Sequence, residues 1–265
     1  AATVKAKMST SKVTKEMSDL FSAIAKKTPT VDVNALDHQV IEVEALVRSK
    51  KYLDAIDVIE TIFKLKEIPI HHHANLLRLI GDCFTKLGDG EAGKNAYLKS
   101  LEYDQYSAKA NIGLGTVGLT NNSFESSVLH FQKAIGLSPE DEMANLGLGL
   151  AFQGLTEYTE ANKWVVKSLE INPDNQAALF TLVQIAQERN DFSDAEVALS
   201  RYMVAHPQDH HIVFTLAGIQ HKLGKNEEAL IKVNQILDID PHDEQAIALS
   251  KELQRALKTA ETSNG

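Results

Sequence analysis

Four of the six prolines in the chain are evenly spaced. Pro139, Pro173, Pro207 and Pro241 each follow the previous one by 34 residues. A fixed period of this length is typical of repeat arrays, in which units of equal length stack along one direction. The period therefore limits the fold more strongly than any local pattern in the chain.

Small and large apolar residues recur with the same period. In 34-residue windows that start at Ala74, Ala108, Glu142, Gln176 and His210, the seventh place always holds Leu or Ile. The twentieth place is always small, with Gly93, Ser127, Ala161, Ala195 and Ala229. Large and small residues at helical spacing predict two helices that pack along one seam. Gly88, Asp89 and Gly90 fall between the two predicted helices and favour a tight turn there.

This pattern resembles the tetratricopeptide repeat over roughly four fifths of the chain. The resemblance implies an all-α fold, a right-handed α-solenoid of stacked helical hairpins with a C-terminal capping helix. The predicted divisions are a basic leader at 1–30, a solenoid at 31–259 and a disordered tail at 260–265. Within the solenoid, repeats are expected at 36–69, 74–107, 108–141, 142–175, 176–209 and 210–243, with the cap helix at 244–259.

The first predicted repeat is weaker than the others. Gln39 and Glu42 occupy places where apolar residues are expected, which is typical of an end repeat that faces water. A four-residue insert, 70–73, follows it and contains three successive histidines. No carboxylate or Cys is placed to complete a tetrahedral shell with them, so we predict a solvated loop and no metal site.

Charge and composition exclude several classes of protein. The chain carries a net charge of -9. Nucleic-acid binding is therefore not expected, because phosphate contacts need clustered Lys and Arg. No apolar run reaches the length of about 18 residues that a membrane span needs. Phosphate-binding loops, nucleophile–base pairs and metal-ligand spacings are all missing from the sequence, so we predict no catalysis and no cofactor.

The leader differs from the rest of the chain. It holds six lysines against Glu16 and Asp19, ahead of an acidic body. Its apolar residues would share one face of a short helix, and they are Val13, Met17, Leu20, Phe21 and Ile24. We predict that this helix docks on the solenoid of its own or a neighbouring chain; a frayed tail is the alternative. The lone Cys83 fits a cytoplasmic location, with a periplasmic or secreted location after leader removal left open.

The resemblance also implies that the first helix of each hairpin lines a concave groove. The candidate groove residues are Arg78, Asp82, Lys86, Lys109, Ile112, Thr116, Leu146, Leu150, Phe180, Gln184 and Phe214. The N-terminal part of this groove is polar and the C-terminal part is apolar. An exposed apolar stripe would mark an interaction site, whereas a register error of one residue would place the same side chains in the core. Gly113 and Gly147 would either carve a notch for a ligand or reflect duplication of one hairpin.

We therefore expect a non-enzymatic adaptor that binds a peptide or amphipathic helix of a partner protein in its concave groove. Two alternatives stay open. The chain could be a scaffold that self-associates as a homo-oligomer through its N-terminal segment. It could also be the regulatory segment of a larger signalling protein, because its lysine-rich connector resembles those of receiver-domain proteins with tetratricopeptide tails.

Overall fold

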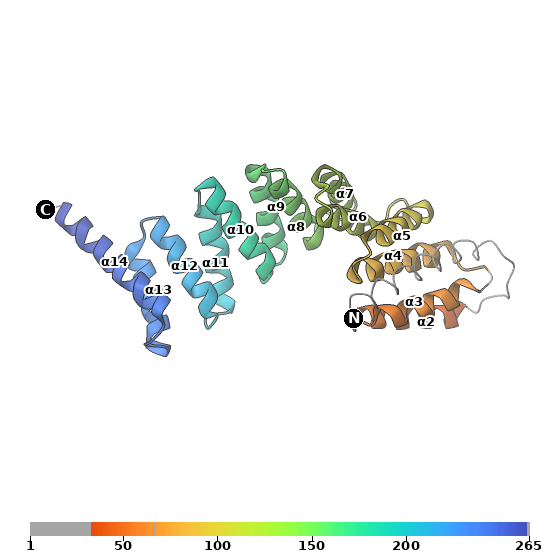
Figure 1. Cartoon of the computed structure of the whole chain (residues 1–265), viewed down its shortest axis with the longest axis horizontal. Coiled ribbons are helices and arrows are strands. Elements are labelled where there is room, and N and C mark those ends of the chain that lie inside the picture. The colour runs from red at the N-terminus through yellow and green to blue at the C-terminus, as the bar shows by residue number, and fades with distance from the viewer. Residues whose placement is uncertain (1–32, 66, 264–265) are drawn as a thin grey trace, which may run out of the picture. The chain divides into compact units, whose positions relative to one another are not determined.

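The computed structural model describes residues 33–65 and 67–263. Within these residues the chain forms 13 helices and no strand, which confirms the predicted all-α fold. The predicted docking of the leader falls outside the described residues. Figure 1 shows the helices in chain order.

The helices form consecutive antiparallel pairs. The first helices of the pairs are α2 (Val33–Arg48), α4 (Ile70–Lys86), α6 (Ala108–Thr120), α8 (Glu142–Gly154), α10 (Gln176–Arg189) and α12 (His210–Lys222). The second helices are α3 (Tyr52–Phe63), α5 (Gly90–Tyr103), α7 (Phe124–Leu137), α9 (Tyr158–Ile171), α11 (Ser193–Ala205) and α13 (Asn226–Ile239), and α14 (Glu244–Ser263) follows them. Inside one unit, each second helix packs both on its own partner and on the first helix of the next pair.

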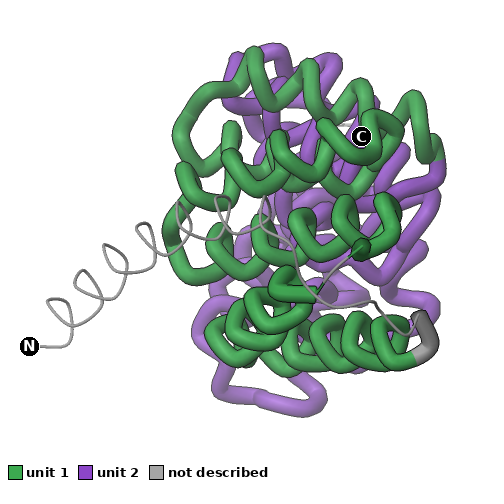
Figure 2. Tube along the Cα trace, turned by 90° about the vertical axis from the view of Figure 1, so that its right-hand side faces the viewer, with its two compact units in different colours: residues 1–139 green, residues 140–265 purple. Residues whose placement is uncertain are grey.

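The chain divides into two compact units, 1–139 and 140–265, which Figure 2 shows in green and purple. Unit 1 contains α2 to α7, and unit 2 contains α8 to α14. Each buried apolar cluster of the described residues lies inside a single unit. Each unit therefore has a core of its own.

Helix starts follow the proline period because a capping residue stands two positions after each proline. The side chains of these residues accept hydrogen bonds from the N–H three residues onward, at 2.9 to 3.3 Å. The capping residues are Asp141, Asn175, Asp209 and Asp243. Ser107 caps α6 in the same way, 34 residues before Asp141, although no proline precedes it. Such caps satisfy N–H groups that a helix start leaves without a partner.

The turns inside the hairpins repeat as well. One residue just after the end of each first helix has a positive φ, and these are Lys50 after α2 and then, at 34-residue intervals, Gly88, Asn122, Thr156, Asn190 and Gly224. Gly and Asn adopt this left-handed conformation readily and terminate helices for that reason. Lys50 and Thr156 are the exceptions, and Thr156 has a φ of 61° on a β-branched residue.

The predicted loop at 70–73 is wrong. Pro69 is the N-cap of α4, so the helix starts at Ile70 and the three histidines form its first turns. His72 is only 7% exposed and its Nε2 lies 3.0 Å from Asp37 Oδ1 of α2. The insert therefore lengthens a helix that packs on the first hairpin. At the other end, α14 continues to Ser263, beyond the predicted boundary at 259.

The first repeat is also better formed than its pattern indicates. α2 buries Leu36, Val40 and Val43, which are four and three residues apart, while Glu42 is exposed. Its apolar face is thus turned by one residue from the register of the other repeats. Since α2 has only one neighbouring side to cover among the described residues, a single apolar stripe is enough to hold it.

The notch predicted at Gly113 is filled by the protein itself. The ring of Tyr97, from α5, packs against both Gly81 of α4 and Gly113 of α6. A Cβ atom on Gly81 would lie 2.5 Å from Tyr97 Cε1, and one on Gly113 would overlap the same ring. These glycines admit an aromatic side chain between two first helices, so Gly113 leaves no space for a ligand.

Candidate functional site

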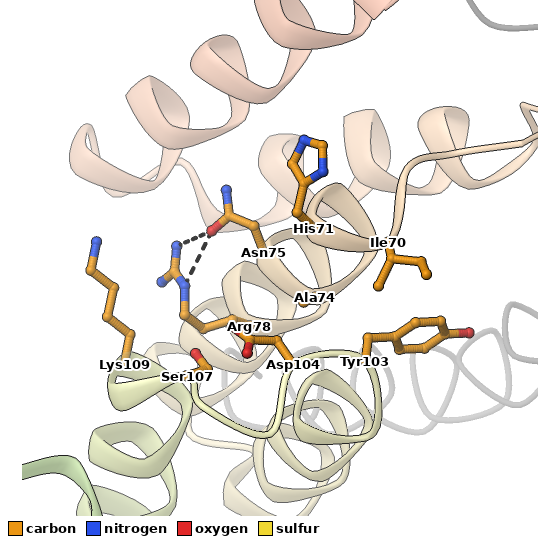
Figure 3. Close-up of a pocket in the computed structure, with 9 residues that line it drawn as sticks. All are labelled: Ile70, His71, Ala74, Asn75, Arg78, Tyr103, Asp104, Ser107 and Lys109. Carbon is orange, nitrogen blue, oxygen red and sulfur yellow. Dashed lines mark hydrogen bonds between the residues drawn. The ribbon is translucent and has the colours of Figure 1, made fainter. Parts of the chain in front are cut away.

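A pocket of about 490 Å³ opens in unit 1 between the second and third hairpins. Its lining comes from the first half of α4, the end of α5 and the start of α6 (Figure 3). The lining residues are Ile70, His71, Ala74, Asn75, Arg78, Tyr103, Asp104, Ser107 and Lys109. A volume of this size is within the range of protein sites that bind small molecules or short peptide segments.

Arg78 is held rigidly at one side of the pocket. Its Nε and Nη2 donate to Asn75 Oδ1 at 3.3 and 2.7 Å, and its Nη1 donates to Asp82 Oδ2 at 2.5 Å. The Arg78 side chain is only 11% exposed. A guanidinium with a fixed orientation loses little further conformational entropy when it binds a ligand.

Asp82 helps to fix the orientation of Arg78 by accepting its hydrogen bond. Its Oδ1 accepts a hydrogen bond from the Tyr97 hydroxyl at 2.8 Å, and Tyr97 is itself buried. Burial raises the pKa of Asp82, while Arg78, Tyr97 and the more distant lysines Lys86 and Lys109 act in the opposite direction. Hydrogen bonds from Tyr97 and from Arg78 to Asp82 therefore connect a core aromatic residue to the pocket wall.

Lys109 supplies an accessible positive charge at the pocket. It stands in the first turn of α6 and forms no ion pair with any other residue of the described ranges. The N-termini of α4 and α6 both contribute to the lining, and neither helix has an acidic residue in its first turn. Because helix N-termini carry a partial positive charge, they add to the effect of Lys109. Asp104 is the acidic residue of the lining, and its Oδ1 accepts from Tyr106 N at 3.1 Å.

The opposite wall of the pocket is apolar. Ile70 and Tyr103 lie across the pocket from Arg78 and Lys109 in Figure 3, and they are 66% and 37% exposed. The Tyr103 ring stacks on the His73 ring, with centroids 5.0 Å apart and an interplanar angle of 11°. Tyr103 is therefore held in place by His73, and part of its side chain stays accessible to a ligand.

The predicted groove residues of unit 1 come together only in part. Arg78 and Lys109 line the pocket and Asp82 supports it, whereas Lys86 is exposed at the end of α4 and does not line it. Ile112 is half-buried on α6. Thr116 is exposed on the same helix, and its hydroxyl donates to the Ile112 carbonyl at 2.9 Å.

In unit 2 the predicted apolar stripe is not continuous. Leu146 is 6% exposed and belongs to the core, and Leu150 packs against the same cluster. Phe180 is 36% exposed, with its ring 5.4 Å from that of His211. Phe214 is half-buried against the cluster that involves α13 and α14. Gln184 is exposed on α10. Leu146 is thus a packing residue, since its side chain faces a neighbouring helix and not solvent.

Sequence reasoning missed much of the pocket. Asn75 occupies the second place of its repeat. The family pattern points this place toward the groove, so the sequence contained a signal for Asn75. Tyr103 lies at the end of a second helix, and Ile70 and His71 belong to the insert; the repeat pattern assigns no inward direction to any of them. Their contribution depends on the early start of α4.

Cys83 and the metal-ligating side chains were the other candidate groups within residues 33–65 and 67–263. Cys83 is fully buried, and burial raises the pKa of its thiol to about 12, so the nucleophilic thiolate is scarce at neutral pH. In the part of the chain that the structure describes, no cluster of three or more metal-ligating side chains occurs. Across those same residues, no helix has both the length and the apolarity to cross a membrane.

Comparisons with known proteins agree with the repeat fold. Residues 180–244 match the family model for the tetratricopeptide repeat. PilF of Pseudomonas aeruginosa is similar in structure with a TM-score of 0.62, at 14% identity over 83% of this chain and 98% of that chain. YrrB, described as a TPR protein with an unusual peptide-binding site, gives 0.53 at 19% identity over 67% and 92%. A chain of the Cut9-Hcn1 hetero-tetramer of the APC/C gives 0.54 at 14% identity over 81% and 42%. A search of curated proteins found no match.

These identities are low, so the similarity of the solved structures concerns the fold. The helical hairpins, their 34-residue period and the match to the family model together define an α-helical repeat protein. Residues 180–244 therefore resemble the tetratricopeptide repeat family in sequence, and the chain shares the helical-repeat fold of the solved structures named above.

Proposed function

We propose that this protein is a non-enzymatic adaptor that binds a segment of a partner protein on the first-helix side of its hairpins. The observation that carries the proposal is the pocket of unit 1, where an ordered Arg78 and an accessible Lys109 lie opposite Ile70 and Tyr103. Fixed polar groups beside an exposed apolar wall are typical of binding sites. The residues that line the pocket contain no paired nucleophile and base, which favours binding over catalysis.

An extended peptide or the face of a helix suits this surface better than a small metabolite does. The pocket is bordered by exposed helix surface, and Thr116 and Ile112 continue that surface along α6. Recognition of peptides by helical repeat proteins uses such a series of side chains from successive first helices. YrrB, a TPR protein with an unusual peptide-binding site, supports the proposal for this chain.

Unit 2 is proposed to contribute a separate apolar contact. Phe180 is the most exposed of the predicted apolar groove residues in this unit, and it lies beside His211. Aromatic side chains are frequent anchors in interfaces because they bury a large area with few rotatable bonds. We expect Phe180, with the accessible part of Phe214, to bind an apolar side chain of the partner.

A capture experiment with the full chain tests the proposal. The immobilised protein is incubated with an extract of the source cells, beside the variants Lys109→Glu, Tyr103→Ala and Phe180→Ser. We expect one specific protein to be retained by the wild type and reduced at least severalfold by each variant. Tyr106→Ala is the matched control, because Tyr106 is 70% exposed in the same connection and does not line the pocket.

Two outcomes would contradict the proposal. One is retention of the same proteins by the wild type and by all three variants while circular dichroism shows that each is folded. The other is a stable oligomer whose assembly covers these surfaces, which would favour the scaffold alternative. Light scattering separates that case, because the adaptor alone predicts a monomer of 29.1 kDa.

A further inference from the structure

We infer that the pocket of unit 1 recognises a paired feature of the partner, an acidic side chain next to an apolar one. The carboxylate would bind between Arg78 and Lys109, and the apolar side chain would pack on Ile70 and Tyr103. This inference rests on the proposed function and specifies the chemistry of the ligand at that same site.

The unused donors of Arg78 support the first half of the inference. A guanidinium has five N–H groups, and three hydrogen bonds to Asn75 and Asp82 leave two of them available. Because Arg78 is almost entirely shielded from water, a hydrogen bond from it to a carboxylate is stronger than one on the open surface. A carboxylate is a planar acceptor that matches two such donors.

The charge of the lining also favours an anion. Asp82 compensates Arg78, so the uncompensated positive charge at the pocket is that of Lys109 together with the two helix N-termini. Asp104 opposes this charge, but its Oδ1 is already engaged by the backbone N–H of Tyr106. The formal charges of these four side chains cancel, so the preference for an anion depends on where Lys109 and the two helix N-termini stand in the lining. An acidic ligand is therefore favoured at the side of the pocket where Arg78 and Lys109 lie.

The second half of the inference comes from the exposed apolar wall. Ile70 is 66% exposed although it is a large aliphatic residue at the start of a helix. Tyr103 is held in place by His73, which in turn contacts the Phe63 ring at 5.6 Å. Covering these two side chains removes apolar area from water, which favours binding. Ile70 and Tyr103 lie on one side of the pocket lining and Arg78 and Lys109 on the other (Figure 3), so we expect neighbouring side chains of a single ligand segment to reach both.

Short synthetic peptides test the inference directly. Each carries a central Glu-Phe pair and is blocked by an acetyl and an amide group, so that the only carboxylate is on the side chain. Binding to the full chain is measured by fluorescence anisotropy, beside the matched Gln-Phe and Glu-Ser peptides. We expect the Glu→Gln change in the peptide to weaken binding by roughly tenfold or more, and added salt to weaken only the Glu peptides.

Variants of the protein test which pocket residues bind each of the two ligand side chains. Lys109→Ala should remove most of the preference for Glu over Gln, and Lys94→Ala, an exposed lysine on α5 outside the lining, should leave it unchanged. Tyr103→Ala should remove the preference for Phe over Ser, and Tyr106→Ala should preserve it. The thermal midpoint of each variant shows whether the fold is intact.

Several results would overturn the inference. These are equal affinity for the Glu and Gln peptides, a Lys109→Ala variant that keeps the full preference, or binding only of peptides with a free C-terminal carboxylate. The inference can fail while the proposed function stands. If the captured partner depends on the pocket but its acidic residues can be replaced by amides without loss, the adaptor stands and only the ligand chemistry is wrong.

Discussion

At the scale of single residues, Tyr97 connects the core of unit 1 to its candidate site. Its ring fills the space that Gly81 and Gly113 leave between α4 and α6, and its hydroxyl holds Asp82, which orients Arg78. Packing and polar geometry therefore depend on one another here. A change that displaces the ring would affect both stability and the position of the guanidinium.

Gly113→Ala tests this arrangement. An added Cβ overlaps the Tyr97 ring, and overpacking of this kind costs about 1–3 kcal/mol. The gain of about 1 kcal/mol from replacing a helical glycine by alanine offsets only part of that cost. We expect a net loss of stability in urea denaturation.

The matched control for that experiment is Gly136→Ala in α7, where a Cβ would meet no atom within 4 Å. This variant should be as stable as the wild type or more stable by up to about 1 kcal/mol. Equal effects of the two substitutions would show that Tyr97 does not occupy the space beside Gly113.

Thr156 is the unfavourable member of a repeated turn position. Asn occupies the equivalent place at Asn122 and Asn190, and Gly does so at Gly88 and Gly224. Because a β-branched residue in the left-handed conformation costs about 1–2 kcal/mol, Thr156→Asn should stabilise unit 2 by about 1 kcal/mol. The reverse change, Asn122→Thr, should destabilise unit 1 by a similar amount. Thermal denaturation of both variants measures the pair, and shifts of the same sign would contradict the assignment.

At the scale of elements, the first turns of α4 determine how the first hairpin docks. His72 lies against Asp37 of α2, and His73 lies between the rings of Phe63 and Tyr103. Burial lowers the pKa of both histidines, with the neighbouring His71 adding to the effect on His72 and Asp37 opposing it. The neutral imidazoles are therefore part of the packed interface.

This environment predicts a loss of stability in acid. The folded pKa values of His72 and His73 lie below 6.5, so the unfolded chain binds protons first as the pH falls through 6.5. The free energy of unfolding should then decrease from pH 7.5 to pH values below 6.5. His130 has a lowered pKa as well and contributes in the same direction.

The variant His72→Gln with His73→Gln isolates the contribution of α4. Its stability should depend less on pH between 7.5 and 5.5 than that of the wild type, whatever its absolute stability. Urea denaturation at the two pH values measures the difference. An unchanged pH dependence in the double variant would assign the effect to other groups.

At the scale of the whole molecule, each unit buries its own apolar clusters. Repeat proteins are stabilised mainly by contacts between neighbouring hairpins, so part of an array can fold without the rest. We expect a fragment of residues 140–265 to be helical by circular dichroism and to unfold cooperatively. A fragment without cooperative unfolding would show that unit 2 needs unit 1 for its stability.

The sequence alone determined the repeat length, the all-α class and the places 108, 142, 176 and 210 where first helices start, because capping and turn residues act over only a few positions. Asp141 starts a helix and Asn190 ends one through hydrogen bonds and backbone conformation within their own neighbourhood. The resemblance to the repeat family also pointed to Arg78 and Lys109, which both line the pocket of unit 1.

Only the tertiary structure decided which of these side chains remain accessible. Leu146 is buried and Phe180 is 36% exposed, although they occupy the same place in consecutive repeats. Gly113 is filled by Tyr97, and the insert at 70–73 extends α4 so that Ile70 and His71 line a pocket with Tyr103. Burial depends on what a distant segment places opposite a residue, and a repeat period carries no information about such contacts.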